Sequence, residues 1–211
     1  MHIKVYESSI MAPVKCGTRY LTHNNLKETH SISVFDLGKR FQIKGLKWMI
    51  VRNPIEGFIS ALHTDILHIV NTLPTQSGFD FSNEELKEEV LSLIYKYESF
   101  FNEEGHYHRN LYREMYWFWR RNHKDINIID LSEMNTYSKE LGLYQPYDSK
   151  SYNFDWFDIW MDKESVALWV KTTFESEFQH LINHILINDI DGEMKMYNHL
   201  INRDLLPIKL F

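Results

Sequence analysis

The stretch that decides the fold is residues 48–60, which read WMIVRNPIEGFIS. Its first four residues are a short apolar run, which is typical of a buried parallel strand. Asn53 can cap a helix, Pro54 suits the first turn, and Glu56 occupies the capping-box position. An apolar stripe at helical spacing follows in Ile55, Phe58, Ile59, Leu62, Ile66 and Ile69. The stretch therefore predicts a strand that turns directly into a helix ending near residue 71.

Strands and helices are expected to alternate along the rest of the chain. Residues 1–6 and 126–130 indicate strands, whereas capping residues and apolar spacing predict helices over residues 82–101, 111–121, 173–190 and 192–203. A chain of 211 residues that is 44% hydrophobic fits a single domain, 1–211. We therefore expect an α/β fold: a three-layer sandwich with a central parallel sheet and a P-loop-like nucleotide-binding architecture.

Two segments place cationic and hydroxyl groups where a strand gives way to a helix. The first is Lys15-Cys16-Gly17-Thr18-Arg19, and the second is Arg52-Asn53-Pro54 with Ser60 further along. Such strand ends are where α/β proteins hold phosphate. Lys15 precedes Gly17, so the GxxxxGK[ST] spacing of the ATP-type P-loop is absent. The segments predict a nucleotide site, but not that of an ordinary ATPase.

At these residues the chain resembles the PAPS-dependent sulfotransferases, in the form of a small carbohydrate-type member such as a bacterial or viral one. The family's phosphosulfate loop, P-K-x-G-T-T-x-L, aligns with residues 14–21, and its 3′-phosphate motif, R-[DN]-P-x5-S, aligns with residues 52–60. Three residues depart from the family pattern: Val14, Arg19 and Gly57. Residues 129–134 and a closing helix from Tyr197 to Leu205 are weaker similarities.

The resemblance implies that PAPS is the sulfuryl donor and that it transfers its group to a hydroxyl acceptor, most plausibly a saccharide. Lys15 would stabilise charge on the departing phosphate, beside Gly17 and Thr18. Cys16 is either a reactive thiol or a small residue that packs the loop. Arg19 either adds a second cation or points outward. The 3′-phosphate would be held by Arg52 and Ser60, because a guanidinium can pair bidentately with phosphate.

Histidines are the candidate general bases, because their ordinary pKa suits proton abstraction near neutral pH. Of the 11 histidines, His30 is the first candidate, since carbohydrate-type relatives carry a catalytic histidine between the two motifs. Its position after the helix that is expected to start at the phosphosulfate loop would bring it near the sulfur. His106 is the second candidate and is expected to shape the acceptor pocket, followed by His108. Each of these histidines can instead be a structural residue.

No metal is expected. His106 and His108, or His180 and His184, have spacings that could suit a metal, but neither pair has an obvious third ligand. The proposed transfer needs none. Aromatic side chains could stack on sugar rings or simply pack in the core, namely Tyr107, Tyr112, Trp117, Trp119, Trp156 and Trp160.

The charge pattern limits the partners. A net charge of −6 argues against a nucleic-acid binder, which would carry a basic face. A local basic group can still attract a polyanionic cofactor, or can be an ordinary solvated face: Lys39, Arg40, Lys44, Lys47 and Arg52. With one cysteine, no signal-peptide core and no apolar run of about 18 residues, the sequence predicts a cytoplasmic protein without a membrane partner.

Two other functions stay open at this stage. One is a P-loop-type kinase or nucleotide phosphotransferase, which the missing Walker spacing disfavours. The other is a non-catalytic nucleotide-binding module of the same fold, which the departures at Val14, Arg19 and Gly57 keep open.

The role of Lys15 gives the first testable prediction. Its ammonium group should matter more in the transition state than in the ground state, so Lys15→Ala should lower kcat by about 100-fold or more, as for loss of one oxyanion donor. The affinity for adenosine 3′,5′-bisphosphate should fall less. Steady-state kinetics with PAPS and calorimetric titration of the product nucleotide separate the two effects. If the variant has a normal kcat and only a raised KM, Lys15 does not take part in the transfer step.

Overall fold

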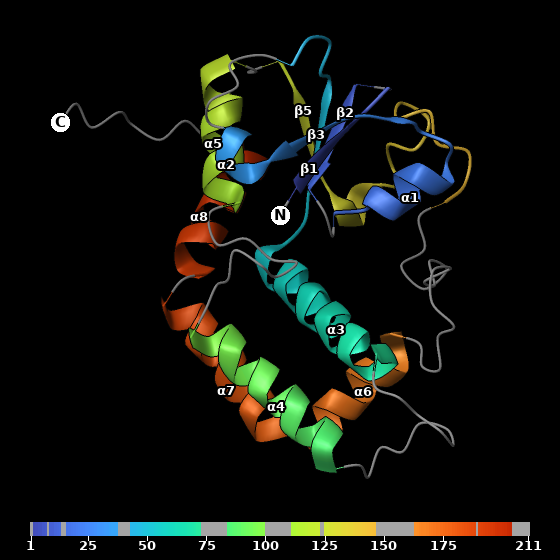
Figure 1. Ribbon diagram of the computed structural model, residues 1–211. Coiled ribbons are helices and arrows are strands. Elements are labelled where there is room, and N and C mark those ends of the chain that lie inside the picture. The colour runs from blue at the N-terminus through green and yellow to red at the C-terminus, as the bar shows by residue number, and fades with distance from the viewer. Residues whose placement is uncertain are drawn as a thin grey trace, which may run out of the picture.

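The computed structural model places most of the chain in two halves, one built around a sheet and one built from helices (Figure 1). The residues that it describes are 2–7, 9–13, 16–37, 43–72, 84–99, 111–122, 125–146, 163–188 and 190–203.

The strands form one five-stranded sheet. They are β1 (His2–Tyr6), β2 (Ile10–Pro13), β3 (Glu28–Ser33), β4 (Trp48–Val51) and β5 (Asn127–Asp130). Their order in the sheet is β3-β1-β2-β4-β5. β2 pairs with β4 and β4 pairs with β5 in parallel, whereas β1 is antiparallel to both of its neighbours. The α/β class is confirmed, but the expected wholly parallel sheet is wrong, because the sheet is mixed.

The length of one connection explains the mixed sheet. A parallel connection needs a dozen or more residues, and only residues 7–9 join β1 to β2. Ser9 closes this turn with a positive φ of 63°, and its amide donates to the Tyr6 carbonyl at 3.0 Å. The connections from β2 to β4 and from β4 to β5 are long and contain helices, so these strands can run in parallel.

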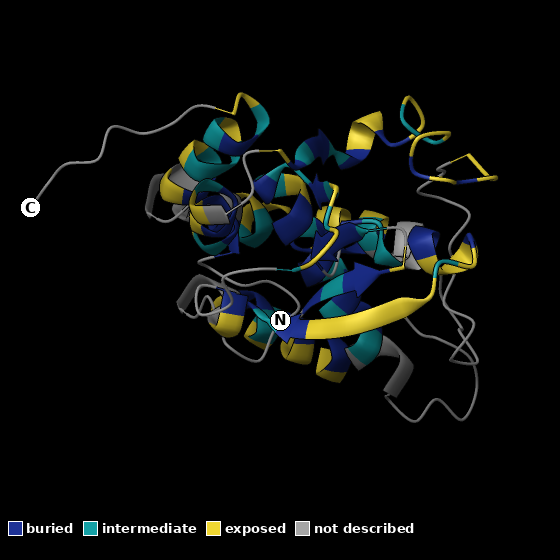
Figure 2. Ribbon diagram, turned by 90° about the horizontal axis from the view of Figure 1, so that it is seen from above, coloured by how far each residue is buried: buried dark blue, intermediate teal, exposed yellow. Residues whose placement is uncertain are grey.

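Alternating side chains divide the core between the two faces of the sheet. Val5, Met11 and Met49 are buried on one face, whereas Ile10 and Ile50 are buried on the other. Only the edge strand β3 is largely exposed among the described strands, and it is mainly yellow in Figure 2. Burial on both faces is why β2 and β4 are nearly continuous apolar runs.

Helical segments cover both faces. The Met49 face packs against α2 (Val34–Leu37), α5 (Leu111–Asn122) and α8 (Ile190–Ile201). The Ile50 face packs against α1 (Thr18–His23) and against the segment that begins with the 3-10 helix η1 (Leu131–Glu133). Figure 1 shows α5 and α1 on opposite sides of the strands.

The helical half has a core of its own. Its members are α3 (Pro54–Thr72), α4 (Glu84–Ser99), α6 (Lys163–Thr173) and α7 (Glu175–Asn188). Phe58, Leu62 and Ile66 from α3 meet Val90 and Ile94 of α4 in this core. Because α3 begins at the sheet and ends deep in the helical half, it connects the two parts (Figure 1).

Residues 48–60 fold as the sequence predicts. β4 ends at Val51, α3 begins at Pro54, and the Asn53 side-chain oxygen accepts the Ile55 amide at 3.0 Å. Glu56, which was expected in a capping box, forms an ion pair with Arg52, with 3.5 Å between Nε and Oε2. This contact brings an acidic group beside the arginine of the second motif.

The other expected elements are present and differ only at their ends. Observed α4, α5, α7 and α8 correspond to the helices expected at 82–101, 111–121, 173–190 and 192–203, and β5 corresponds to the strand at 126–130. Within the described residues, none of the helices combines the length and the apolar character that crossing a membrane requires.

Candidate functional site

The candidate site lies at the edge where β2, β4 and β5 end. Their parallel pairing aligns Val51 with Asp130, and β2 runs alongside in the same direction until Pro13. The first motif follows β2 and the second follows β4, so both begin at the same edge. Because β2 and β4 are neighbours in the sheet, the two motifs are also adjacent.

Gly17 is required at the turn into α1. Its φ of 79° lies in the left-handed region, and an added Cβ would stand 2.7 Å from the Leu131 Cδ1 atom and 3.0 Å from the Met134 Cε atom. Any larger residue would therefore meet both backbone strain and a steric clash. The turn is held further by Thr18, whose carbonyl accepts the Tyr6 hydroxyl at 3.0 Å.

Three predicted site residues lie wholly or partly outside the described part of the chain. Lys15 and His106 fall in the ranges 14–15 and 100–110, and of Arg19 only the backbone is described, as part of α1. His108 shares the range with His106. The placement of these side chains at the site therefore stays a prediction.

Arg52, Glu56 and Ser60 form one row along the first turns of α3. Residues four apart share a helix face, and the Arg52–Glu56 ion pair shows that Arg52 continues that row. The Arg52 side chain is 22% exposed, and its carbonyl accepts a hydrogen bond from the Tyr112 hydroxyl. Ser60 is buried at 8% exposure, and Thr64 donates to its carbonyl at 2.8 Å. Glu56 thus stands between the two residues expected to bind the 3′-phosphate.

Cys16 is a packing residue of this edge. The side chain is 2% exposed and belongs to the core on the α1 face. Burial raises the pKa of its thiol to about 12, although the Arg52 charge and a hydrogen bond with Tyr112 favour the thiolate. Since the thiolate is the reactive form, the alternative of a reactive thiol is not supported.

Asp130 organises the end of β5. One carboxylate oxygen accepts the Ser132 amide at 2.8 Å and the Ser132 hydroxyl at 2.6 Å, while the Glu133 carboxylate accepts the Asp130 amide at 3.3 Å. This is a reciprocal capping box around η1. The other oxygen accepts the Tyr197 hydroxyl at 2.6 Å. Asp130 therefore fixes both the segment after β5 and the helix α8.

Two tyrosines complete the edge, and sequence reasoning gave neither a role there. Tyr112 from α5 and Tyr197 from α8 meet edge to face, with ring centroids 5.7 Å apart. Burial, followed by the bond to Asp130 and its negative charge, raises the pKa of Tyr197 far above its usual value. The Tyr112 amide donates to the buried Glu193 carboxylate at 2.9 Å. No sequence spacing links these residues, which come together only through packing of α5 on α8.

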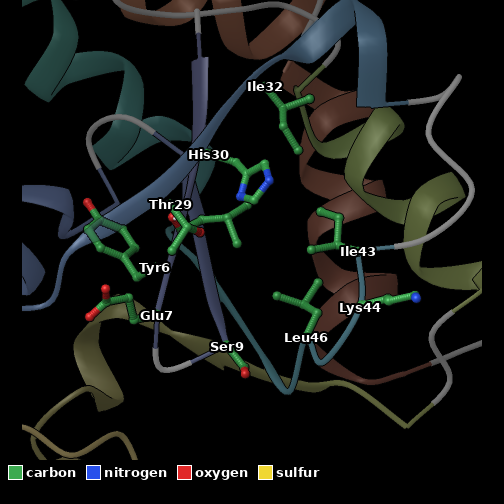
Figure 3. A pocket seen from close by; sticks show the side chains of 10 residues that line it. Tyr6, Glu7, Ser9, Thr29, His30, Ile32, Ile43, Lys44 and Leu46 are labelled. Carbon is green, nitrogen blue, oxygen red and sulfur yellow. The ribbon is translucent and has the colours of Figure 1, made fainter.

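His30 is not near the first motif. It lies in the middle of β3, opposite Val5, with β1 between it and β2. Its side chain is exposed and lines a pocket together with Ser9, Ile43 and Lys44, which belong to the opposite edge of the sheet (Figure 3). The expectation that His30 would follow α1 into the site is therefore wrong, because the chain after α1 forms the outer strand of the sheet.

The expected basic group is also divided. Lys44 and Lys47 precede β4, whereas Arg52 follows it, so a whole strand separates them. Lys39 and Arg40 lie outside the described residues.

The metal candidates are not brought together with the motifs. His180 is exposed on α7, far along the chain from the motifs. The described residues contain no cluster of three or more His, Cys, Asp and Glu side chains suited to a metal ion.

Comparisons with protein-family models, with curated proteins and with solved structures found no match to this chain. The resemblance to sulfotransferases therefore rests on the sequence motifs described above.

The burial of Cys16 gives a prediction for its reactivity. In the native protein at pH 8, alkylation by iodoacetamide should be at least about 100-fold slower than in guanidinium chloride, because burial both shields the thiol and disfavours the thiolate. The measurement is unambiguous because the chain has one cysteine. Equal rates in the native and unfolded protein would mean that the loop leaves Cys16 open to solvent.

Proposed function

We propose that the protein is a PAPS-dependent sulfotransferase whose acceptor is the hydroxyl group of a saccharide. The observation that carries the proposal is the adjacency of its two motifs at the carboxyl ends of the parallel strands β2 and β4. This edge is where open α/β sheets bind nucleotides. The same proposal includes a P-loop-like role for the turn between β2 and α1, in which this turn binds the phosphate groups.

The two phosphate groups of the donor suit different parts of the edge. In the proposal, the 5′-phosphosulfate lies against residues 15–18, where Gly17 lets the backbone approach closely. The 3′-phosphate lies against Arg52, with Ser60 further along the same helix row. That second contact distinguishes the donor from ATP or AMP, which lack a 3′-phosphate.

Glu56 adds a constraint to this binding mode. Its carboxylate is 63% exposed and is paired with the Arg52 guanidinium. A phosphate at Arg52 must move this carboxylate aside, because two anions on one guanidinium repel each other. The exposed ion pair itself is weak, so a dianionic phosphate can replace the carboxylate.

The proposed chemistry is an in-line displacement at sulfur. The acceptor oxygen forms a bond to sulfur while the bond from sulfur to the bridging phosphate oxygen breaks, which yields a sulfate ester and adenosine 3′,5′-bisphosphate. The acceptor proton passes to a general base, and Lys15 stabilises the leaving phosphate. Because His30 lies beyond β1 from the first motif, we assign the base to His106.

The 3′-phosphate contact predicts a selective loss of affinity. Arg52→Ala should weaken binding of adenosine 3′,5′-bisphosphate by about 10- to 100-fold and leave any affinity for AMP nearly unchanged. Isothermal titration of both nucleotides measures this. Glu56→Gln is the matched variant, and it should strengthen binding of the bisphosphate severalfold, since it removes the competing charge from Arg52.

Thermal shift of the unmodified protein separates the alternatives, because a ligand of the native state raises the midpoint. Stabilisation by adenosine 3′,5′-bisphosphate but not by Mg-ATP is the expected result. Stabilisation by Mg-ATP alone would favour a phosphotransferase, and stabilisation by neither nucleotide would contradict the nucleotide site.

In the Arg52→Ala titration, an equal loss of affinity for adenosine 3′,5′-bisphosphate and for AMP would mean that Arg52 supports the fold and does not bind the 3′-phosphate.

The choice of base gives a separate prediction. His106→Ala should lower kcat by about 10²- to 10⁴-fold, the usual contribution of a general base, and should abolish the acidic limb of the pH–rate profile. His30→Ala is the matched control and should keep both the rate and the profile. Bisphosphate binding should be unchanged in both variants. If only His30→Ala shows a large loss of kcat, His30 is the general base instead of His106.

A further inference from the structure

A pocket lies at the sheet edge opposite the proposed nucleotide site. It has a volume of about 360 Å³ and lies between β1, β3, the β1–β2 turn and residues 43–46 (Figure 3). Known small-molecule pockets occupy about 300 to 1,000 Å³, so this pocket is large enough for a ligand. The proposed sulfuryl transfer does not use it.

The walls of the pocket are held by hydrogen bonds to backbone carbonyl groups. Ser9 adopts a left-handed conformation, and its carbonyl accepts the amides of Lys47 at 2.9 Å and Trp48 at 3.1 Å. A serine in this conformation persists only where its surroundings hold it. On the other side, the Thr29 hydroxyl donates to the Val5 carbonyl at 3.1 Å. The pocket is therefore preformed, which lowers the entropic cost of binding.

The lining combines an apolar wall with polar side chains, among which is the His30 imidazole. The wall consists of aliphatic side chains: Val5, Ile32, Ile43 and Leu46. In Figure 3 the imidazole of His30 lies on the side of the pocket that faces Ile43. The charged ends of Glu7 and Lys44 extend away from the centre, in opposite directions, and Lys44 follows Ile43 on the same wall.

These features define the chemistry of a ligand. An imidazole can donate a hydrogen bond through a ring N–H, so it suits the oxygen of an anionic acceptor. The aliphatic wall suits an apolar body. Since one water occupies about 30 Å³ in the liquid, the pocket holds a ligand of about a dozen non-hydrogen atoms.

We propose that this pocket binds a small monocarboxylic acid with an apolar body, whose carboxylate accepts a hydrogen bond from His30. The apolar part lies against Ile43 and Leu46, and the Lys44 ammonium group adds positive potential at the rim. The site is separate from the Arg52 edge and does not depend on the proposed transfer reaction.

Three probes with the same apolar body and different head groups test the proposal: 3-phenylpropanoate, 3-phenylpropan-1-ol and protonated 3-phenylpropan-1-amine. NMR titration of ¹⁵N-labelled full-length protein gives each affinity. The carboxylate should bind in the low millimolar range or tighter, the alcohol at least about threefold more weakly, and the ammonium probe most weakly. Saturating adenosine 3′,5′-bisphosphate should leave these affinities unchanged.

Two variants locate the binding. His30→Ala should lower the affinity for 3-phenylpropanoate by about 5- to 10-fold and remove its advantage over the alcohol. His180→Ala is the matched control, because His180 is an exposed histidine on the distant helix α7, and it should change nothing. Leu46→Gln should weaken the binding of all three probes, because it makes the apolar wall smaller. This second variant keeps the test informative if His30→Ala folds poorly.

Several results would overturn the proposal. Absence of binding by the carboxylate would exclude the site, and equal affinities of carboxylate and alcohol for the native protein would exclude anion recognition. Unchanged carboxylate affinity in a folded His30→Ala variant would exclude His30 as the contact.

Discussion

The parallel pairing of β2, β4 and β5 is the constraint on which the rest of the candidate site depends. Parallel strands end at the same edge, so Gly17, Arg52 and Asp130 come together although they are far apart in sequence. The sheet is buried on both faces, which leaves its strand ends as the place where polar groups can gather without burying unpaired backbone. The short connection between β1 and β2 places the antiparallel strands on the other side of β2 and keeps them out of this edge.

The same edge is also the junction between the two halves of the molecule. α3 leaves it toward the helical core, while Tyr112 and Tyr197 reach it from α5 and α8. Tyr112 bonds the backbone of Arg52, and Tyr197 bonds Asp130, so side chains from late in the chain hold the ends of β4 and β5. A ligand at this edge would therefore contact groups whose positions depend on both parts of the fold, and nucleotide binding would stabilise their association.

Electrostatics separate the two ends of the sheet. At the carboxyl ends, one described cation, Arg52, is balanced by Glu56 and lies near Asp130. At the other end, Lys44 and Lys47 are exposed beside the His30 pocket. In a chain with a net charge of −6, the unbalanced positive charge among these groups therefore lies at the Lys44 and Lys47 end, whereas Arg52 is paired with an acidic neighbour. The separation of the two ends by the length of β4 is the reason that we treat them as different sites.

The sequence by itself determined the local structure. The apolar run at 48–51, the Asn53 cap and the stripe from Ile55 onward specify β4 and α3, because each depends on near neighbours and on a periodicity that can be read directly. The strand-to-helix turns that hold both motifs could be predicted for the same reason. The sequence did not determine strand order or direction. The antiparallel pairing of β1 with β2 and β3, the removal of His30 to the opposite edge, and the approach of Tyr112 and Tyr197 to Arg52 and Asp130 were decided only by the tertiary structure. The β1–β2 pairing is set by the short connection at residues 7–9 once both strands form. The pairing of β1 with β3 and the other two arrangements depend on contacts between residues distant in sequence, which no local propensity or spacing encodes.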